Sequence, residues 1–254
     1  MGIINLYPRQ RHLRLLKSKN RTINRDKQIQ PLRGKTKGKL KISLLFSSKI
    51  EFFEKGSCMP YVRTTYTDEA ELIGDMLGLY NGGKTVELDP CYSIGRFWNN
   101  FEKPKLKFDL IPQVEGVMEA DCTNLPLAND SINSIMFDPP FMIGIGKSAS
   151  GILTKRFSGF KSLQELQNLY SRSLIEFRRI LNKDGLIFFK CQDTVTSGKQ
   201  FFAHIFIINM AIAFDYIAED LFVLVRNRAM IDPKWNGQKH ARKTHSYFLV
   251  LRKK

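Results

Sequence analysis

The sequence predicts an α/β fold built around a mostly parallel sheet, and three observations support this. From Thr67 onward, short apolar runs alternate with longer stretches of helical periodicity. Several apolar runs end at an acidic residue, as strand ends in nucleotide-binding α/β sheets often do. The last two runs have no helical pattern between them, which favours an antiparallel pair at the end of the sheet.

Each part of the chain has an expected assignment. The first helix is expected to begin at Thr67 as its cap and to run to about Tyr80, where Asn81-Gly82-Gly83 ends it. Further helices are expected over Leu163–Leu181 and Lys199–Phe214. The seven expected strands are Thr85–Asp89, Leu106–Leu110, Gly116–Ala120, Ser134–Asp138, Leu186–Lys190, Leu221–Val225 and Tyr247–Leu251.

The positive charge is concentrated at the start of the chain. The 254 residues carry a net charge of +16, and residues 1–41 hold 13 lysines and arginines against the single acid Asp26. We therefore predict a basic, largely disordered arm over residues 1–45 and one folded domain over residues 46–254. Such an arm is typical of contact with nucleic-acid phosphates. A solvated tail and a mistranslated upstream extension are the alternatives.

The cysteines and the hydropathy exclude some classes of protein. Cys58, Cys91, Cys122 and Cys191 are far apart, with no CxxC or CxxH spacing, so we expect no metal site and a reduced, cytoplasmic location. No apolar run reaches the roughly 20 residues that span a bilayer, so no membrane partner is expected. A surface-binding helix around Leu13, Leu15 and Leu16 of the basic arm is the less favoured alternative. The basic N-terminus also lacks the apolar segment of a signal peptide.

A turn of small residues follows the first expected strand, over Asp89-Pro90-Cys91-Tyr92-Ser93-Ile94-Gly95. Gly95 and Ser93 would let the backbone approach a ligand closely. The pattern is neither GxGxxG nor a P-loop, so an ordinary tight turn is the alternative. Asp109 lies about 20 residues later, where an acid can accept hydrogen bonds from ribose hydroxyls. Glu119 and Asp121 lie at the end of the third strand and could accept from an adenine amine, or could simply be strand-end acids.

The most informative stretch is Asp138-Pro139-Pro140-Phe141, directly after an apolar strand. Two prolines stiffen the loop and remove N–H donors, so it presents acceptors. The Asp138 carboxylate and the Pro139 carbonyl can both accept from one amine, which aims the nitrogen lone pair at an electrophile. Phe141 can stack on the ring that carries the amine. A rigid turn with a packed Phe is the structural alternative.

These residues resemble the amino-methyltransferase branch of the Rossmann-like, S-adenosylmethionine-dependent methyltransferases. Asp138–Phe141 matches the family's catalytic [DNS]-P-P-[YFW] tetrapeptide, and Leu88–Gly95 is similar to its Asp-Pro-Phe-x-Gly-x-Gly cofactor turn. Cys91 stands where Phe is usual and Ser93 where the first Gly is usual. The tail from His245 is similar to the closing strand of DNA N4/N6 methylases. The resemblance covers about Thr67–Lys253.

The resemblance implies a class I fold, a seven-stranded sheet with an antiparallel last strand, and S-adenosyl-L-methionine as cofactor. It places Asp138, Pro139, Pro140 and Phe141 in the catalytic site. It places the following residues around the cofactor: Asp89, Pro90, Ser93, Gly95, Asp109 and Asp121.

Three other segments have open assignments. Residues 144–160, which combine glycines with basic residues, are expected to form a lid over the substrate or a plain surface loop. Gln192 could read a base edge, or Asp193 could merely cap a helix. Residues 226–244 place basic side chains around Trp235, which suits a nucleic-acid contact or a solvated hairpin.

The sequence therefore favours a DNA adenine-N6 methyltransferase that flips its target base out of the helix. An RNA base methyltransferase acting on adenine N6 or guanine N2 is the alternative. A non-catalytic nucleic-acid-binding protein on a methyltransferase core is a third possibility, against which the intact Asp138 tetrapeptide argues. Cytosine N4 is the less favoured amine, because Asp with Phe favours adenine.

Overall fold

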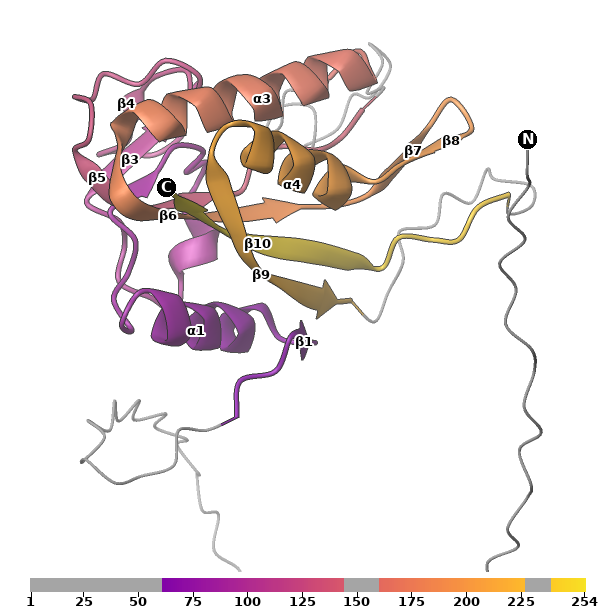
Figure 1. The fold of residues 1–254 in the computed structure, drawn as a ribbon, viewed down its shortest axis with the longest axis horizontal. Coiled ribbons are helices and arrows are strands. Elements are labelled where there is room, and N and C mark those ends of the chain that lie inside the picture. Colours follow the sequence, from indigo (N-terminus) through magenta and orange to yellow (C-terminus); the bar gives the residue numbers. More distant parts are fainter. Residues whose placement is uncertain (1–60, 144–159, 227–238) are drawn as a thin grey trace, which may run out of the picture. The chain divides into compact units, whose positions relative to one another are not determined.

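The computed structural model describes residues 61–143, 160–226 and 239–254, all within one compact unit, Cys58–Lys254. A single sheet dominates this unit, with the strand order β1-β9-β10-β6-β5-β2-β3-β4 (Figure 1). The strands are β1 (Thr65–Tyr66), β2 (Leu88–Asp89), β3 (Leu106–Asp109), β4 (Met118–Glu119), β5 (Ile132–Phe137), β6 (Leu181–Cys191), β9 (Tyr216–Val225) and β10 (His245–Lys253).

All neighbouring strands pair in parallel except β10, which is antiparallel to both β6 and β9. The predicted α/β class, the mostly parallel sheet and the antiparallel last strand are therefore confirmed. The strand count differs: the described sheet has eight strands rather than seven, because the short β1 adds to the outer edge of β9.

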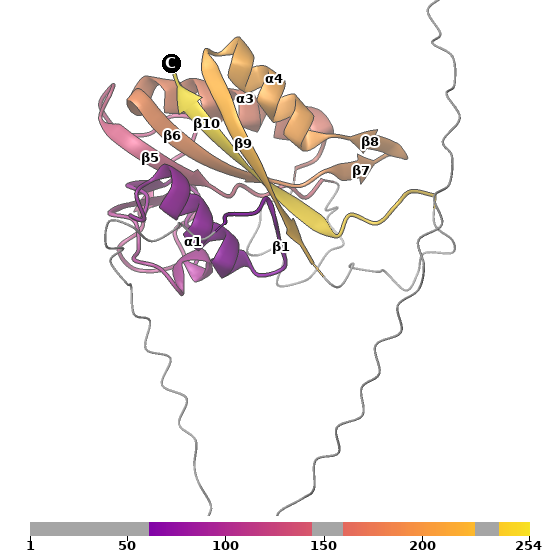
Figure 2. The same ribbon diagram turned by 60° about the horizontal axis from the view of Figure 1, so that its bottom comes forward.

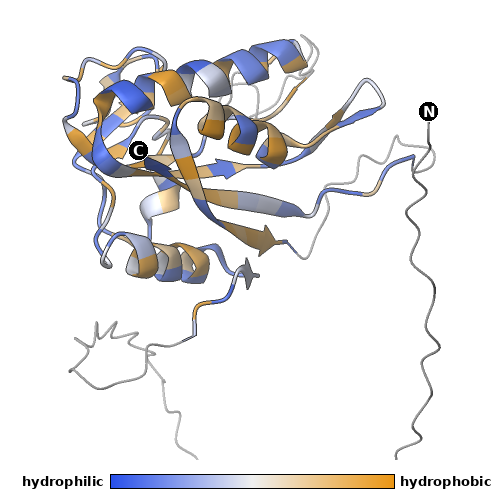
Figure 3. Cartoon of the chain, viewed as in Figure 1, coloured by the Kyte–Doolittle hydropathy of each residue, from blue (hydrophilic) through white to orange (hydrophobic). Residues whose placement is uncertain are grey.

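The sheet lies between two layers of helices. Helix α3 (Leu163–Ile180) and helix α4 (Ala203–Ala213) cover one face, whereas α1 (Glu69–Tyr80) and the 3-10 helix η1 (Arg96–Trp98) cover the other (Figures 1 and 2). Each interface contains its own apolar cluster, one centred on Phe137, Phe177 and Phe189 and the other on Trp98 and Phe248. In Figure 3 the hydrophobic residues are accordingly concentrated on the sheet and on the helix faces that meet it.

The helices begin at side-chain caps. Asp68, not the expected Thr67, caps α1 by accepting the Glu71 N–H at 2.9 Å. Ser162 caps α3 through the Glu165 N–H. Helix α1 ends where Asn81 and Gly83 both donate their N–H groups to the Leu77 carbonyl. Because Gly83 has a φ of 73°, a left-handed conformation that glycine adopts easily, the predicted stop is confirmed.

The expected helix over Lys199–Phe214 is wrong in its first turn. Residues Lys199–Phe201 form strand β8, which pairs with β7 (Thr194–Thr196) in a small hairpin. Ser197 and Gly198, both with positive φ, make the turn. Helix α4 begins only at Ala203, whose N–H donates to the Asp193 carboxylate at 2.9 Å. Asp193 therefore caps this helix.

Some expectations concern residues beyond the described ranges. These are the basic arm over residues 1–45, the lid over most of 144–160, and most of the basic segment at 226–244. Among the described residues, no helix is both long and apolar enough to cross a membrane.

Candidate functional site

The two main motifs meet where the strand order changes direction. Strand β2 lies between β3 and β5, so the chain moves outward through β3 and β4 and then returns to the other side of β2. Ligands of open α/β sheets bind at such a switch point, beyond the carboxyl ends of the strands. Asp89 ends β2 and Asp138 directly follows β5. Both acids that the motifs singled out are therefore at this crevice.

Asp89 holds the turn after β2 together. Its side chain is buried and accepts hydrogen bonds from the Cys91 N–H at 3.0 Å and from the Trp98 indole at 2.7 Å. Burial raises the pKa of Asp89 to about 7, against the lowering effect of these two bonds, and the charges of Asp138 and Asp109 raise it further. Pro90, the next residue, is buried too. Asp89 thus ties the predicted cofactor turn to η1.

Gly95 and Ser93 adopt the left-handed backbone that this turn requires. Their φ angles are 72° and 52°. A Cβ at Gly95 would lie 2.5–2.7 Å from the hydroxyl oxygen and two ring carbons of Tyr92, which is itself buried, so only glycine fits here. The Ser93 hydroxyl is buried and has no hydrogen-bond partner among the described residues.

Asp109 connects the same turn to β3. Its carboxylate accepts the Ser93 N–H at 2.8 Å and the Ile111 N–H at 3.0 Å. Asp121 lies beyond β4, where its exposed side chain accepts the Thr123 N–H at 2.8 Å. The structure therefore brings Asp89, Ser93, Gly95 and Asp109 into one hydrogen-bonded turn, with Asp121 on the next loop of the same edge.

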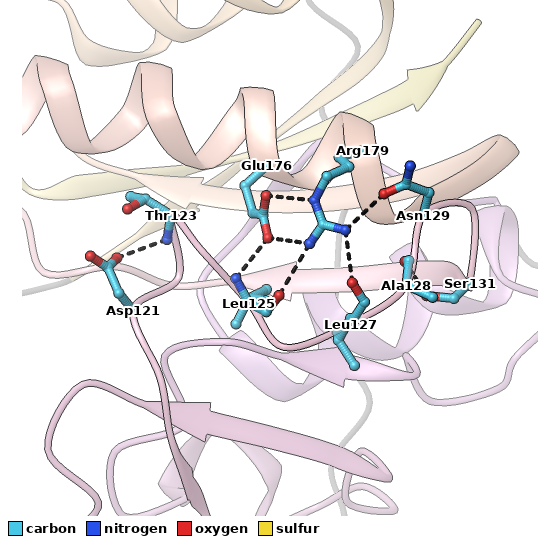
Figure 4. A network of polar contacts seen from close by, with 9 residues as sticks. All are labelled: Asp121, Thr123, Leu125, Leu127, Ala128, Asn129, Ser131, Glu176 and Arg179. Atoms are coloured by element: carbon cyan, nitrogen blue, oxygen red, sulfur yellow. Dashed lines mark hydrogen bonds and ion pairs between the residues drawn. The ribbon is translucent and has the colours of Figure 1, made fainter.

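The loop that carries Asp121 is fastened to α3 by two charged residues. Arg179 donates to the carbonyls of Leu125 and Leu127, and the buried Glu176 accepts the Leu125 N–H at 2.7 Å (Figure 4). Arg179 and Glu176 also form an ion pair at 2.7 Å. Burial would raise the pKa of Glu176, but these hydrogen bonds lower it below its ordinary value.

Asp138 is half-buried and has a charged partner. Its Oδ2 lies 3.0 Å from the Nζ of Lys190, near the end of β6, and the same Nζ lies 2.7 Å from Glu69 at the start of α1. Burial by itself would lower the pKa of Lys190, but the two carboxylates outweigh it and raise the pKa. Asp138 Oδ1 accepts no hydrogen bond from the residues that the structure describes.

The other three residues of the tetrapeptide belong to the same loop as Asp138. Pro139 is buried, whereas Pro140 and Phe141 are partly exposed. The Phe160 N–H donates to the Met142 carbonyl at 3.0 Å, and Ile143 pairs with Phe160 in an isolated parallel bridge. The chain before residue 144 and the chain after residue 159 therefore lie together beside the tetrapeptide.

A second polar cluster lies at the same edge of the sheet, around the start of β10. The Nδ1 of His204 lies 2.8 Å from the Oδ1 of Asp193. The His204 ring also packs against the ring of Tyr247, tilted by 34° and with the two centroids 4.2 Å apart. The Tyr247 hydroxyl lies 2.8 Å from His245 Nε2. Burial raises the pKa of Tyr247. Gln192, considered for base reading, donates to the Lys243 carbonyl at 3.4 Å.

Sequence reasoning missed the pairing of Lys190 with Asp138. A signal for it existed, because Lys190 ends the otherwise apolar run Leu186–Phe189 in a predicted interior strand. A charge in such a position is almost always paired. What the sequence lacked was the register: Phe137 is opposite Phe189, so Asp138 and Lys190 come next on adjacent strands.

No family model and no curated protein matches the chain. Solved structures do align with it, and two are of a proposed DNA modification methylase from Thermus thermophilus. The first has 14% identity and a TM-score of 0.36 over 53% of this chain and 52% of that one. The second, a complex with S-adenosyl-L-methionine, has 16% identity and a TM-score of 0.37 over 52% and 53%.

A proposed type 11 methyltransferase from Sulfolobus solfataricus has 13% identity and a TM-score of 0.37 over 70% of this chain and 90% of that one. The chain thus spans about half the length of the Thermus structures that it matches. All of these TM-scores lie below 0.5, so the fold class rests on the strand order described above, which is that of a mostly parallel α/β sheet with one antiparallel strand.

Proposed function

We propose that this protein transfers a methyl group from S-adenosyl-L-methionine to the exocyclic amine of a nucleobase, with adenine N6 in DNA as the substrate. One observation carries the proposal: Asp138-Pro139-Pro140-Phe141 follows the strand at the switch point, beside the glycine-containing turn after β2. A rigid amine-accepting loop is thereby adjacent to a turn with a backbone suited to a cofactor.

The turn after β2 fits such a cofactor in two respects. The unpartnered hydroxyl of Ser93 is a hydrogen-bonding group that a bound ligand would satisfy. Asp109 and Asp121 can still accept from ribose hydroxyls and from the adenine amine, because each carboxylate has more acceptor positions than the one or two bonds it makes. Acidic side chains around the site also favour a cationic sulfonium.

The cofactor supplies an electrophilic methyl group, and the chain's residues prepare the amine. Asp138 Oδ1 and the Pro139 carbonyl accept the two N–H groups of the target amine, so the nitrogen lone pair points toward the methyl group. Phe141 stacks on the base. Positive charge develops on the nitrogen during transfer, and the Asp138 carboxylate stabilises it and receives the proton directly or through water.

The charge of the chain favours a nucleic-acid substrate. Its net charge of +16 would attract a polyanion at physiological ionic strength. An exocyclic amine on a nucleobase is conjugated and weakly nucleophilic, so it must be flipped out and aligned, and the tetrapeptide is suited to that task. The same loop would accept an RNA base, so the test must compare both polymers.

The test is transfer of a labelled methyl group from S-adenosyl-L-methionine to duplex DNA, single-stranded DNA and total RNA, followed by digestion to nucleosides. We expect label in N6-methyladenine from DNA and at least a ~10²-fold loss in Asp138→Ala. Cofactor binding by calorimetry should survive in that variant. Label found only in RNA would show that RNA, and not DNA, is the substrate. Absence of both transfer and cofactor binding would overturn the proposal.

A further inference from the structure

Lys190 is the buried cation that stands beside the candidate catalytic acid. Its side chain is only 8% exposed, although it carries a charge and lies at the end of a strand. The ammonium contacts the carboxylates of Asp138 and Glu69 and lies 5.4 Å and 5.5 Å from the ring centres of Phe97 and Phe248. Two carboxylates and two aromatic faces therefore form a cage that suits a cation.

Four parts of the fold contribute to the cage around the ammonium. Asp138 comes from the loop after β5, Glu69 from the first turn of α1, Phe97 from η1, and Phe248 from β10. An ammonium with so many fixed partners has little rotational freedom. Among the described residues, Lys190 is the donor to the Asp138 carboxylate and contacts it at Oδ2, so the ammonium restrains this oxygen and leaves Oδ1 without a described donor. This is the arrangement that an amine-accepting carboxylate requires.

We propose that Lys190 is a positioning residue for methyl transfer, which holds the Asp138 carboxylate oriented toward the target amine. The inference rests on the proposed function and deepens it. Lys190 contacts neither cofactor nor base in this scheme; it acts through Asp138. Without the ammonium, the carboxylate would rotate freely and would sit beside Glu69 and near Asp89 with its negative charge uncompensated.

The test compares the wild type with Lys190→Met, which keeps the stem of the side chain and removes the charge. We expect kcat to fall about 10²-fold, while the affinity for S-adenosyl-L-methionine by calorimetry changes less than about threefold. The double variant Lys190→Met/Glu69→Gln is the control for folding, because it also removes the charge of one of the two carboxylates that lose their cationic partner. It should recover thermal stability but not kcat. Recovery of kcat in the double variant would overturn the inference.

A second readout does not require activity. In ¹³C-aspartate NMR spectra at one fixed pH, with the Asp138 signal assigned by its loss in Asp138→Asn, the Asp138 carboxyl signal should move in Lys190→Met, because the ammonium that lies 3.0 Å from Oδ2 is removed. An unchanged signal would overturn the inference, even if the wild type methylates DNA. An unmethylated nucleic acid together with a moved signal would overturn the proposed function alone.

Discussion

Asp89 shows how one buried carboxyl group couples the stability of the turn after β2 to pH. Its pKa is about 7 in the folded chain and 3.8 ordinarily, chiefly because burial disfavours the charged form. Between these two values the folded chain binds a proton that the unfolded chain has lost. The stabilising contribution of this proton is complete below about pH 4 and is lost as the pH rises through 7.

We therefore expect the free energy of unfolding to decline between about pH 4 and pH 7, by at most about 1.4 kcal/mol per pH unit from this group. Urea unfolding across that range measures the decline. Asp89→Asn has no carboxyl proton to lose, so its stability should depend less on pH than that of the wild type. Equal slopes in the two proteins would show that Asp89 does not titrate in this window.

A second prediction concerns the lack of space around Gly95. In Gly95→Ala the new methyl group would combine a positive φ with a clash against the buried Tyr92 ring, so we expect a loss of roughly 2–5 kcal/mol and weaker cofactor binding. Gly198→Ala is the matched control: φ is 73° there, but nothing lies within 4 Å of the added carbon, so only about 1–2 kcal/mol is expected. Chemical denaturation and calorimetry measure both effects.

Strands marked by turns or acids at their ends were predictable, whereas short strands without such marks were not. All seven expected strands are present, including the two-residue β2 and β4, which end at Asp89 and Glu119. Strand β1 has two residues, and the β7–β8 strands have three each, so no periodicity could reveal them. Their existence depends on neighbours distant in sequence, such as Val223 for β1.

The residues of the candidate site also fall into two groups, those that the sequence could reveal and those that it could not. Asp89, Gly95, Asp109 and Asp138 could be identified from turns and strand ends, because those are local features of the sequence. The pairing of Asp138 with Lys190 depends on the register between β5 and β6, which no local pattern contains. The mistaken start of the helix at Lys199 has a related cause, since only the contact with Asp193 fixes where α4 begins.

The contact between α3 and the loop of Asp121 predicts a difference between two adjacent arginines. Arg179→Met would leave the carbonyls of Leu125 and Leu127 without their donor, so we expect a loss of roughly 1–3 kcal/mol and weaker cofactor binding. Arg178→Met is the control, because Arg178 is equally exposed but pairs at 3.3 Å with the solvent-exposed Asp215. That pair should contribute at most about 1 kcal/mol.

Urea unfolding of both variants distinguishes the two arginines, and calorimetry with S-adenosyl-L-methionine shows whether the loop matters to the cofactor. If Arg178→Met and Arg179→Met lose the same stability, the hydrogen bonds in Figure 4 contribute nothing beyond a surface ion pair. If only stability changes and cofactor affinity does not, the loop of Asp121 lies outside the cofactor site.

Charge is distributed unevenly over the whole chain. Residues 1–41 hold about three quarters of the net +16, whereas the carboxyl edge of the sheet presents Asp89, Asp109, Asp121 and Asp138. An acidic crevice suits a sulfonium and an amine that gains positive charge, but it would repel a phosphate backbone. We infer that the affinity for nucleic acid comes from basic residues outside the crevice, and that catalysis comes from the acids within it.

This division predicts separable effects on binding and on chemistry. Neutralising four arm residues by substitution with Gln should lower the slope of log K against log salt by up to about 3.6, since each lost phosphate contact removes about 0.9. The four are Arg9, Arg11, Arg14 and Lys17. Cofactor affinity and kcat at saturating DNA should not change, because no acid of the crevice is altered.

The matched control removes the same number of charges from exposed lysines near the amino ends of β2, β3 and β6, on the sheet edge opposite the crevice. These are Lys84, Lys103, Lys105 and Lys183. Fluorescence anisotropy with a labelled duplex, at salt concentrations from 50 to 300 mM (roughly the range over which such slopes are linear), compares the two variants. A steep slope that survives in the arm variant but is lost in the control would place the DNA contact on the folded domain and contradict the division. The reverse would assign phosphate binding to the arm and leave the crevice to the base and the cofactor.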